Sequence, residues 1–294
     1  MLVVTSAREL QALTSRCVRQ GQSIAFVPTM GFLHDGHMSL ITEGRRRGDV
    51  LVVSIYVNPL QFGPGENLDS YPRSLPRDSE LCRSAGVDIL FQPAPDDLYP
   101  EGCQTRVAVG ELAEGLCGAA RPGHFSGVCT VVLKLFNLVR PRWAIFGSKD
   151  YQQLQVVRAM VRDLNLDVEV VAMPTVREPD GLAMSSRNAR LDPEQREQAR
   201  CLSAGLALAE QLVRDGERDP ARLVERVRLL INEQGLAEVD YISLADARSL
   251  RPVVGTLEAP AILALAVRFG GTRLIDNREL LLPAAASTGT TVVL

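Results

Sequence analysis

The sequence predicts an α/β protein, in which a Rossmann-like parallel-sheet domain is followed by a smaller α+β domain. In the first part of the chain, short apolar runs alternate with amphipathic stretches. The apolar runs are nearly continuous, as in strands that are buried on both faces of a parallel sheet. After Val176 the pattern changes to helices followed by consecutive strands, which is typical of an α+β domain. We therefore expect one domain over residues 1–176 and a second over residues 177–294.

Strands and helices alternate in the expected first domain. The strands are Ile24–Val27, Val50–Val57, Val87–Phe91, Trp143–Phe146 and Val168–Met173. The helices lie near Met38–Arg47, Asp78–Ala85, Val128–Val139 and Gln152–Asp163. The segment Asn58–Arg77 is rich in Pro, Gly and polar residues, so we expect a long functional loop or lid there.

The expected second domain begins with helices and ends with strands. Its helices are Asp192–Arg214 and Ala221–Glu233, and its strands are Tyr241–Leu244, Ala261–Phe269 and Thr272–Ile275. Gly270 and Gly271 predict a tight turn between the last two strands. The tail Pro283–Leu294 carries little information, although Val292–Leu294 could pair at a sheet edge.

Composition limits the classes of function. The chain has 294 residues and a net charge of −3, which argues against a nucleic-acid-binding protein. No apolar run reaches the about 18–20 residues that span a bilayer, and the first residues lack a signal-peptide pattern. The six cysteines are scattered and form no C-x-x-C pair, so we expect reduced thiols rather than a zinc site or a disulfide framework. We expect a cytoplasmic protein without a membrane partner or a protein-bound metal.

Two histidines follow the first expected strand. After Pro28 and Thr29 comes a glycine-broken turn, in which His34 and His37 are three residues apart at the start of a helix. Such a helix N-terminus at a strand end can hold a phosphate. Gly31 and Gly36 would let the backbone approach the ligand closely. The alternative is an ordinary capped helix start without function. The only other histidine, His124, lies in a similar glycine-bracketed segment, Gly123–Gly127, which favours function.

Lysine is rare in this chain, where only two of the 32 basic residues are lysines. Lys134 lies in an expected helix and can extend to solvent. Lys149 follows the expected strand Trp143–Phe146 directly, at the edge where open α/β sheets bind ligands. A compact ammonium kept at that edge suits a phosphate.

A third polar segment lies at the expected domain boundary. Ser185 and Ser186 are followed by Arg187, whose guanidinium can bind two phosphate oxygens at once. The alternative is a solvated helix cap, because serine also favours that position.

These segments resemble known signatures. The stretch from Pro28 to His37 is similar to the HIGH-type motif of the class I synthetase and nucleotidyltransferase superfamily, and Met184–Arg187 resembles its mobile KMSKS-type loop. Four further stretches resemble the pantoate–β-alanine ligase (pantothenate synthetase) family. They are Asn58–Gly63, Tyr71–Arg73, Gly147–Gln153 and Arg273–Asn277. Ser148 and Asn67 depart from that family, which commonly has acidic residues at these two positions.

The resemblance implies an activity and a set of site residues. The reaction would be the ATP-dependent condensation of pantoate with β-alanine through a pantoyl adenylate, which releases AMP and pyrophosphate. The implied catalytic residues are His37, His34 and Lys149. The implied ATP-binding residues are Met30, Gly31, His34, Gly36, His37, Gly147, Ser148, Lys149, Asp150, Val176, Met184, Ser185, Ser186 and Arg187. The implied contacts to pantoate and β-alanine are Gln61, Gln153, Asn58, Arg121 and His124. Mg²⁺ would accompany ATP, held mainly by phosphate oxygens and water, and a homodimer is expected.

Three other interpretations remain open. Another small-molecule nucleotidyltransferase of the same superfamily would reuse the histidine loop but would lack the pair Gln61 and Gln153. A tRNA-charging enzyme would need an anticodon-reading module and a basic face. A nucleotide sensor would keep the fold without the chemistry, although His34, His37 and Lys149 are all present.

Overall fold

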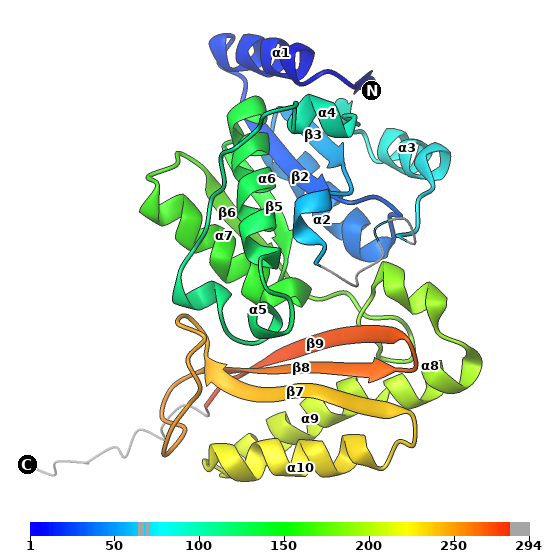
Figure 1. Ribbon diagram of the computed structural model, residues 1–294, viewed down its shortest axis with the longest axis vertical. Coiled ribbons are helices and arrows are strands. Elements are labelled where there is room, and N and C mark those ends of the chain that lie inside the picture. The colour runs from blue at the N-terminus through cyan, green and yellow to red at the C-terminus, as the bar shows by residue number, and fades with distance from the viewer. Residues whose placement is uncertain (64–67, 69–70, 283–294) are drawn as a thin grey trace, which may run out of the picture.

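The computed structural model describes residues 1–63, 68 and 71–282. The chain forms a large α/β domain and, beside it, a small domain built on a three-stranded sheet (Figure 1). Strand β9 is the strand of the small sheet that lies nearest the large domain. The positions of Asn67 and of Val292–Leu294, for which an edge strand was considered, fall outside the described residues.

The large domain contains the predicted parallel sheet. Its strands are β1 (Leu2–Val4), β2 (Ile24–Thr29), β3 (Val50–Ile55), β4 (Ile89–Phe91), β5 (Trp143–Gly147) and β6 (Glu169–Met173). Their order is β1-β4-β3-β2-β5-β6, and every neighbouring pair is parallel. The chain builds outward from β2 to β3 and β4, and then returns to place β5 on the other side of β2. The crevice where the order reverses is the usual ligand position in such sheets.

Helices cover both faces of this sheet. They are α1 (Ala7–Arg19), α2 (Asp35–Arg47), α3 (Leu75–Ser84), α4 (Pro95–Leu98), α5 (Cys117–Ala120), α6 (His124–Val139) and α7 (Tyr151–Asp163). Alternate residues of β2 enter opposite cores, because successive strand side chains point to opposite faces. Phe26 packs in the core that contains residues of α1, α6 and α7, and Val27 packs in the core that contains residues of α2 and α3.

The small domain has the predicted α+β composition. It contains α8 (Pro193–Ala199), α9 (Cys201–Arg214), α10 (Pro220–Asn232), β7 (Ala237–Asp246), β8 (Ala261–Phe269) and β9 (Thr272–Leu280). The strands pair antiparallel in the order β7-β8-β9, and α9 and α10 bury their apolar residues against them. The predicted turn at Gly270 and Gly271 is confirmed, since it joins the paired residues Phe269 and Thr272.

Some boundaries differ from the sequence prediction. A continuous helix over Asp192–Arg214 is wrong, because the N–H of Arg200 turns back to the carbonyl of Glu197, which ends α8 before α9 begins. The segment Asn58–Arg77 is not entirely loop: it contains a 3₁₀ turn, η1 (Pro59–Gln61), and the start of α3. Further 3₁₀ turns are η2 (Glu111–Ala113), η3 (Ser148–Asp150) and η4 (Ser186–Arg190).

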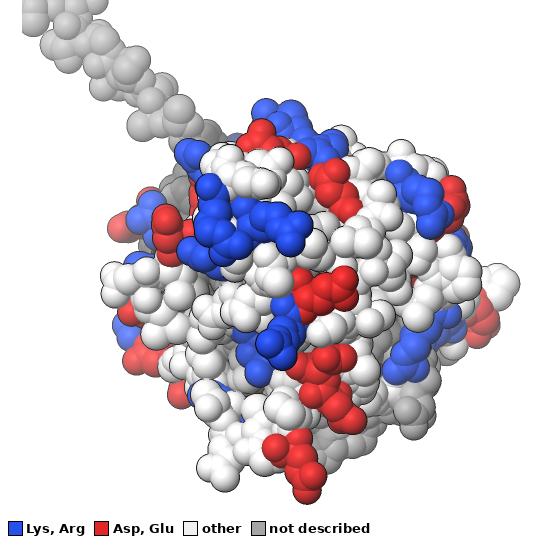
Figure 2. Space-filling view, turned by 90° about the horizontal axis from the view of Figure 1, so that it is seen from above, with Lys and Arg blue, Asp and Glu red and all other residues white. Residues whose placement is uncertain are grey.

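Charges of both signs are mixed on the face of the large domain seen in Figure 2. Groups of basic side chains on this face are interrupted by acidic and uncharged ones. No helix in the described part of the chain is long and apolar enough to cross a membrane.

A buried carboxylate fixes the loop between β2 and α2. Asp78, at the start of α3, is fully buried, and it accepts hydrogen bonds from the backbone N–H groups of Phe32 (2.7 Å) and Leu33 (2.8 Å). Phe32 has a φ of 51°, a conformation unfavourable for a bulky residue. The Asp78 carboxylate therefore holds in place the strained turn that leads to the histidines.

Replacing Asp78 should destabilise the protein through this turn. Asp78→Ala would leave the N–H groups of Phe32 and Leu33 unpaired, which costs about 1–3 kcal/mol for each buried group. We expect a lower free energy of unfolding in urea denaturation. The control is Asp163→Ala at the exposed end of α7. Its free energy of unfolding should stay within about 0.5 kcal/mol of that of the unmodified protein. Equal stabilities of the two variants would contradict the role of Asp78.

Candidate active site

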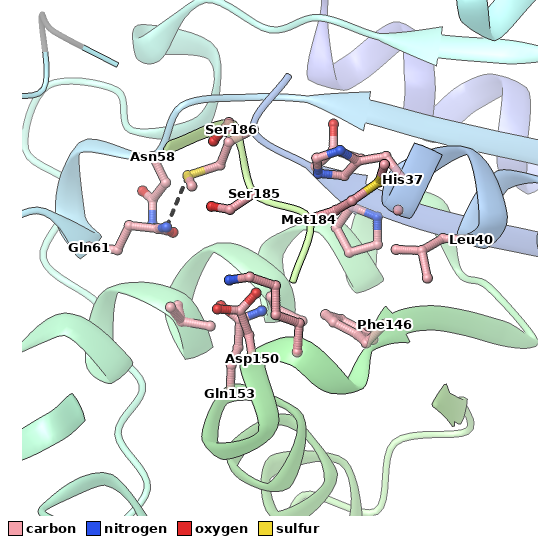
Figure 3. Close-up of a pocket in the computed structure, with 18 of the residues that line it drawn as sticks. His37, Leu40, Asn58, Gln61, Phe146, Asp150, Gln153, Met184, Ser185 and Ser186 are labelled. Carbon is pink, nitrogen blue, oxygen red and sulfur yellow. Dashed lines mark hydrogen bonds between the residues drawn. The ribbon is translucent and has the colours of Figure 1, made fainter. Parts of the chain in front are cut away.

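A cavity of about 230 Å³ lies at the carboxyl edge of the large sheet, where the strand order reverses. Its walls come from the ends of β2, β5 and β6, from α6 and α7, and from the loop before η4 (Figure 3). Every predicted site residue lines this cavity except Gly31 and Ser148. The fold thus brings together three polar segments that are far apart in the sequence.

The two histidines are stacked at the start of α2. His34 is the N-cap residue, and its ring centroid lies 4.1 Å from that of His37. The backbone N–H of His34 donates to Nδ1 of His37 (3.3 Å), so the proton of a neutral His37 ring is on Nε2. Burial lowers the pKa of His37 to about 3, and the neighbouring His34 contributes to this lowering. The pKa of His34 is also lowered, first by burial and then by Lys149.

Local packing requires the glycines of this loop. A Cβ on Gly36 would lie 2.9 Å from Cε1 of His34, so the glycine makes room for that ring. Gly31 has a φ of 84°, and a Cβ there would lie 2.9 Å from Cγ2 of Ile55. Glycine is therefore required at both positions by the geometry of the loop itself.

Positive charge dominates the lining of the cavity. Its charged side chains are Arg121, Lys149, Arg187 and one carboxylate, Asp150. Within the described part of the chain, neither the Lys149 ammonium nor the Arg187 guanidinium has a hydrogen bond or an ion pair. Burial raises the pKa of Asp150, but the positive charges of Lys149 and Arg187 outweigh it, so that this pKa is lowered. Among the described residues, these two cations are thus available to bind an anion.

The predicted substrate residues are held by a hydrogen-bond network around η1. The Asn58 amide donates to Oε1 of Gln61 (3.1 Å), and Nε2 of Gln61 lies 3.0 Å from the sulfur of Met30 (Figure 3). His124 donates from Nδ1 to the Gln61 carbonyl (2.8 Å), and Arg121 donates to Nε2 of His124 (3.0 Å). Asn58, Arg121 and His124 therefore fix the position of Gln61.

Opposite this network, Gln153 extends from the first turn of α7 into the cavity. Within the described part of the chain its amide has no hydrogen-bond partner, so it is available to a ligand.

The serine loop, Met184–Arg187, is both a helix cap and a wall of the cavity. Ser185 accepts a hydrogen bond from the N–H of Arg187 (3.3 Å) and so caps η4, as the alternative interpretation expected. It also lines the cavity with Ser186 and Arg187. The N–H of Met184 donates to the carbonyl of Val176 (3.0 Å), which ties this loop to the end of β6.

Two parts of the lining escaped the sequence analysis. The Tyr71 hydroxyl lies 3.4 Å from the Ser186 hydroxyl, so a residue of the Asn58–Arg77 segment reaches the serine loop. The other part is an apolar wall formed by α6, whose lining residues are Val128, Val131, Val132 and Leu135. The sequence gives no signal for this wall, because an apolar helix position that faces a cavity cannot be told from one that faces the core.

The described residues contain no group of three His, Cys, Asp or Glu side chains that could hold a metal ion. A parallel sheet with a cation-lined cavity at its switch point, beside paired histidines at a helix N-terminus, defines an α/β protein whose site suits a phosphate-bearing ligand such as a nucleotide. A family model described as pantoate-beta-alanine ligase matches residues 2–279. The chain belongs to this family.

Individual relatives are similar over nearly the whole chain. Pantothenate synthetase from Geobacter sulfurreducens is 54% identical over 277 residues, which cover 94% of this chain and 98% of the relative. The crystal structure of pantothenate synthetase from Thermus thermophilus is 46% identical with a TM-score of 0.91, over 96% of this chain and 100% of that one.

A third similar protein was solved with ligands. It is pantoate-beta-alanine ligase from Francisella tularensis, complexed with Beta-gamma ATP and Beta-alanine. It is 35% identical with a TM-score of 0.80, over 95% of this chain and 97% of that one. The activity of the present chain is accordingly the ATP-dependent joining of pantoate to β-alanine, which makes pantothenate.

The lowered pKa of His37 predicts a pH dependence of stability. Between pH ~6.5 and about 3 the unfolded chain binds a proton at this position that the folded chain does not. The contribution of neutral His37 to the stability of the fold is therefore fully present above pH ~6.5, and it is lost as the pH falls through this window. We expect a smaller loss of stability between pH 7 and pH 5 in His37→Gln than in the unmodified protein, measured by urea unfolding. Equal losses would contradict the lowered pKa.

Proposed function

We propose that the ligation proceeds in two half-reactions around this one cavity. The pantoate carboxylate attacks the α-phosphorus of ATP, which gives pantoyl adenylate and pyrophosphate. The amine of β-alanine then attacks the activated carbonyl and releases AMP. The observation that carries the proposal is the convergence of the histidine pair, Lys149 and the serine loop on one cavity. Adenylation needs alignment and charge stabilisation more than covalent help, and these groups supply both.

The phosphates of ATP bind to Lys149 and Arg187, the two cations of the cavity that have no ion pair within the described part of the chain. Lys149 neutralises charge near the reacting phosphorus, and Arg187 with Ser185 and Ser186 binds the β- and γ-phosphates. His37 is neutral at physiological pH because its pKa is lowered. It therefore acts as a hydrogen-bond donor from Nε2 to the departing pyrophosphate, and His34 supports it from the adjacent position.

Pantoate lies between the two glutamines. The amides of Gln61 and Gln153 offer donors and acceptors for its hydroxyl and carboxylate groups. Its two methyl groups pack against the apolar wall of α6, which is the matching surface in the cavity. The β-alanine bound in the Francisella relative supports a site for the second substrate in the same fold.

Mg²⁺ enters the reaction with ATP. Asp150 is the one carboxylate among the described residues that line the cavity. A single carboxylate suits an ion that keeps most of its ligands from phosphate oxygens and water, as Mg²⁺ does. The ion would neutralise phosphate charge during the adenylation.

We further propose a homodimer in the cytoplasm. The six cysteines are all free, which fits a reducing compartment. The dimer rests on the family resemblance, and sedimentation of the purified protein tests it.

Nucleotide analysis tests the adenylate route. With ATP, Mg²⁺ and pantoate we expect labelled pyrophosphate to be exchanged into ATP. We expect AMP to form over multiple turnovers of the enzyme only after β-alanine is added. Lys149→Ala and His37→Ala should each slow the exchange by about 10²–10³-fold, because each removes stabilisation of developing charge. Lys134→Ala is the control, since the Lys134 ammonium lies 5.6 Å from the Tyr99 ring centroid and does not line the cavity. Formation of ADP, or exchange without pantoate, would contradict the route.

The serine loop has a separate test. The double variant Ser185→Ala/Ser186→Ala lacks two hydroxyl donors to the phosphates. Because a hydrogen bond to a charged group contributes about 1.5–3 kcal/mol, we expect weaker ATP binding and pyrophosphate exchange that is slower by about tenfold or more. The control is Ser84→Ala at the exposed end of α3. Unchanged ATP affinity and turnover in the double variant would remove the serines from the mechanism.

A further inference from the structure

Two neighbouring residues of β9 contact the segments that leave the large sheet beside the active site. Asp276 and Asn277 belong to the small domain, but their side chains bond to segments that follow β5 and β6 of the large sheet. Successive strand residues point in opposite directions, so one strand can reach two separate loops. Neither residue lines the cavity of about 230 Å³, but both line a smaller cavity of about 50 Å³ that shares Lys149 with it.

Asn277 holds the turn that carries Lys149. Its side-chain amide donates to the carbonyl of Ser148 (3.1 Å) and to the carbonyl of Lys149 (2.8 Å). Both carbonyls belong to η3, the short turn at the end of β5. A three-residue 3₁₀ turn has few internal hydrogen bonds, so two bonds from outside fix its orientation.

Asp276 holds the second loop. Its carboxylate is 2% exposed and accepts two hydrogen bonds from the Arg177 guanidinium, at 2.7 and 3.0 Å. Arg177 follows Val176 directly and also donates to the carbonyl of Gly181 (3.1 Å). The Asp276 carboxylate further accepts the N–H of Asn277 (2.8 Å), so the two β9 residues form one connected unit.

The position of the Lys149 ammonium depends on this support. That ammonium has no hydrogen bond or ion pair within the described part of the chain, so only its backbone and its own rotamer determine where it lies. The orientation of the turn determines where the flexible lysine side chain can reach, and β5 and α7 already hold the turn at its two ends. The two bonds from Asn277 restrict the turn, and they come from a different domain.

We propose that Asn277 is a positioning residue for the adenylation step, because it orients the turn that carries Lys149. Asp276 supports this role by anchoring β9 to Arg177. The inference rests on the proposed role of Lys149. It places one determinant of the reaction rate on the small domain, in the wall of the smaller cavity rather than of the larger one. A purely structural Asn277 would contribute to stability but not to the rate of the folded enzyme.

Asn277→Ala and the nearly isosteric Asn277→Leu both remove the two donors. We expect the kcat of pyrophosphate exchange to fall about tenfold to hundredfold in each, since small misplacements of a catalytic group have effects of that size. The KM for pantoate should change less than about twofold, because the pantoate contacts stay in place. The matched control is Arg278→Ala, the next residue on β9, which loses a 2.6 Å ion pair with Glu210 inside the small domain. This control should keep the exchange rate of the unmodified enzyme.

A double variant separates positioning from loss of structure. If Asn277 acts through Lys149, then Asn277→Ala should add no further loss of exchange in a Lys149→Ala background. The same fractional loss in both backgrounds, or an unchanged kcat in folded Asn277→Ala, would overturn the inference. The unmodified enzyme serves as the reference: if it lacks pantoate-dependent exchange, the adenylate route itself fails, and not only the role of Asn277.

Discussion

The parallel pairing of β2 with β5 is the constraint on which the rest of the molecule depends. These strands are far apart in the sequence, and their pairing brings the histidine loop after β2 beside the lysine turn after β5. Connections leaving two such strands on opposite sides of the sheet separate at the carboxyl edge and leave a crevice. The segment that leads into the small domain then contributes the serine loop to the wall of this crevice.

In the crevice, hydrogen-bond donation and positive charge come from different residues. Burial keeps the pKa values of both histidines low, so these rings offer hydrogen bonds without carrying charge. Positive charge comes from Arg121, Lys149 and Arg187 instead. A cleft in which positive charge predominates concentrates an anionic substrate near it. The geometry therefore separates attraction of the polyphosphate from hydrogen bonding to its leaving group.

The sequence predicted the elements whose signals are local. Strands such as Val50–Ile55 were found because they are nearly continuous apolar runs, and the histidine pair and Lys149 were found because they follow strand ends. Other cavity residues, among them Gln61 and Gln153, were implied by the family resemblance. Strand β1 was missed, since it has only three residues and Leu2 and Val3 are 46% and 45% exposed. The helix α1 was also missed.

The supporting contacts could not be predicted for a different reason. Asp78 and Asn277 act through backbone groups of segments that are distant in sequence. Nothing in the local pattern of an aspartate or an asparagine shows which carbonyl or N–H it will meet. Such contacts are defined only when the topology is complete.

Asn277 contacts the turn in a way that does not depend on the side chain at position 148. The amide contacts the carbonyl of Ser148, which every amino acid has, and not its side chain. Ser148 does not line the cavity either. The two hydrogen bonds from Asn277 therefore place no requirement on the side chain at position 148. A contact made to the main chain constrains the shape of a turn without constraining the type of residue that stands there.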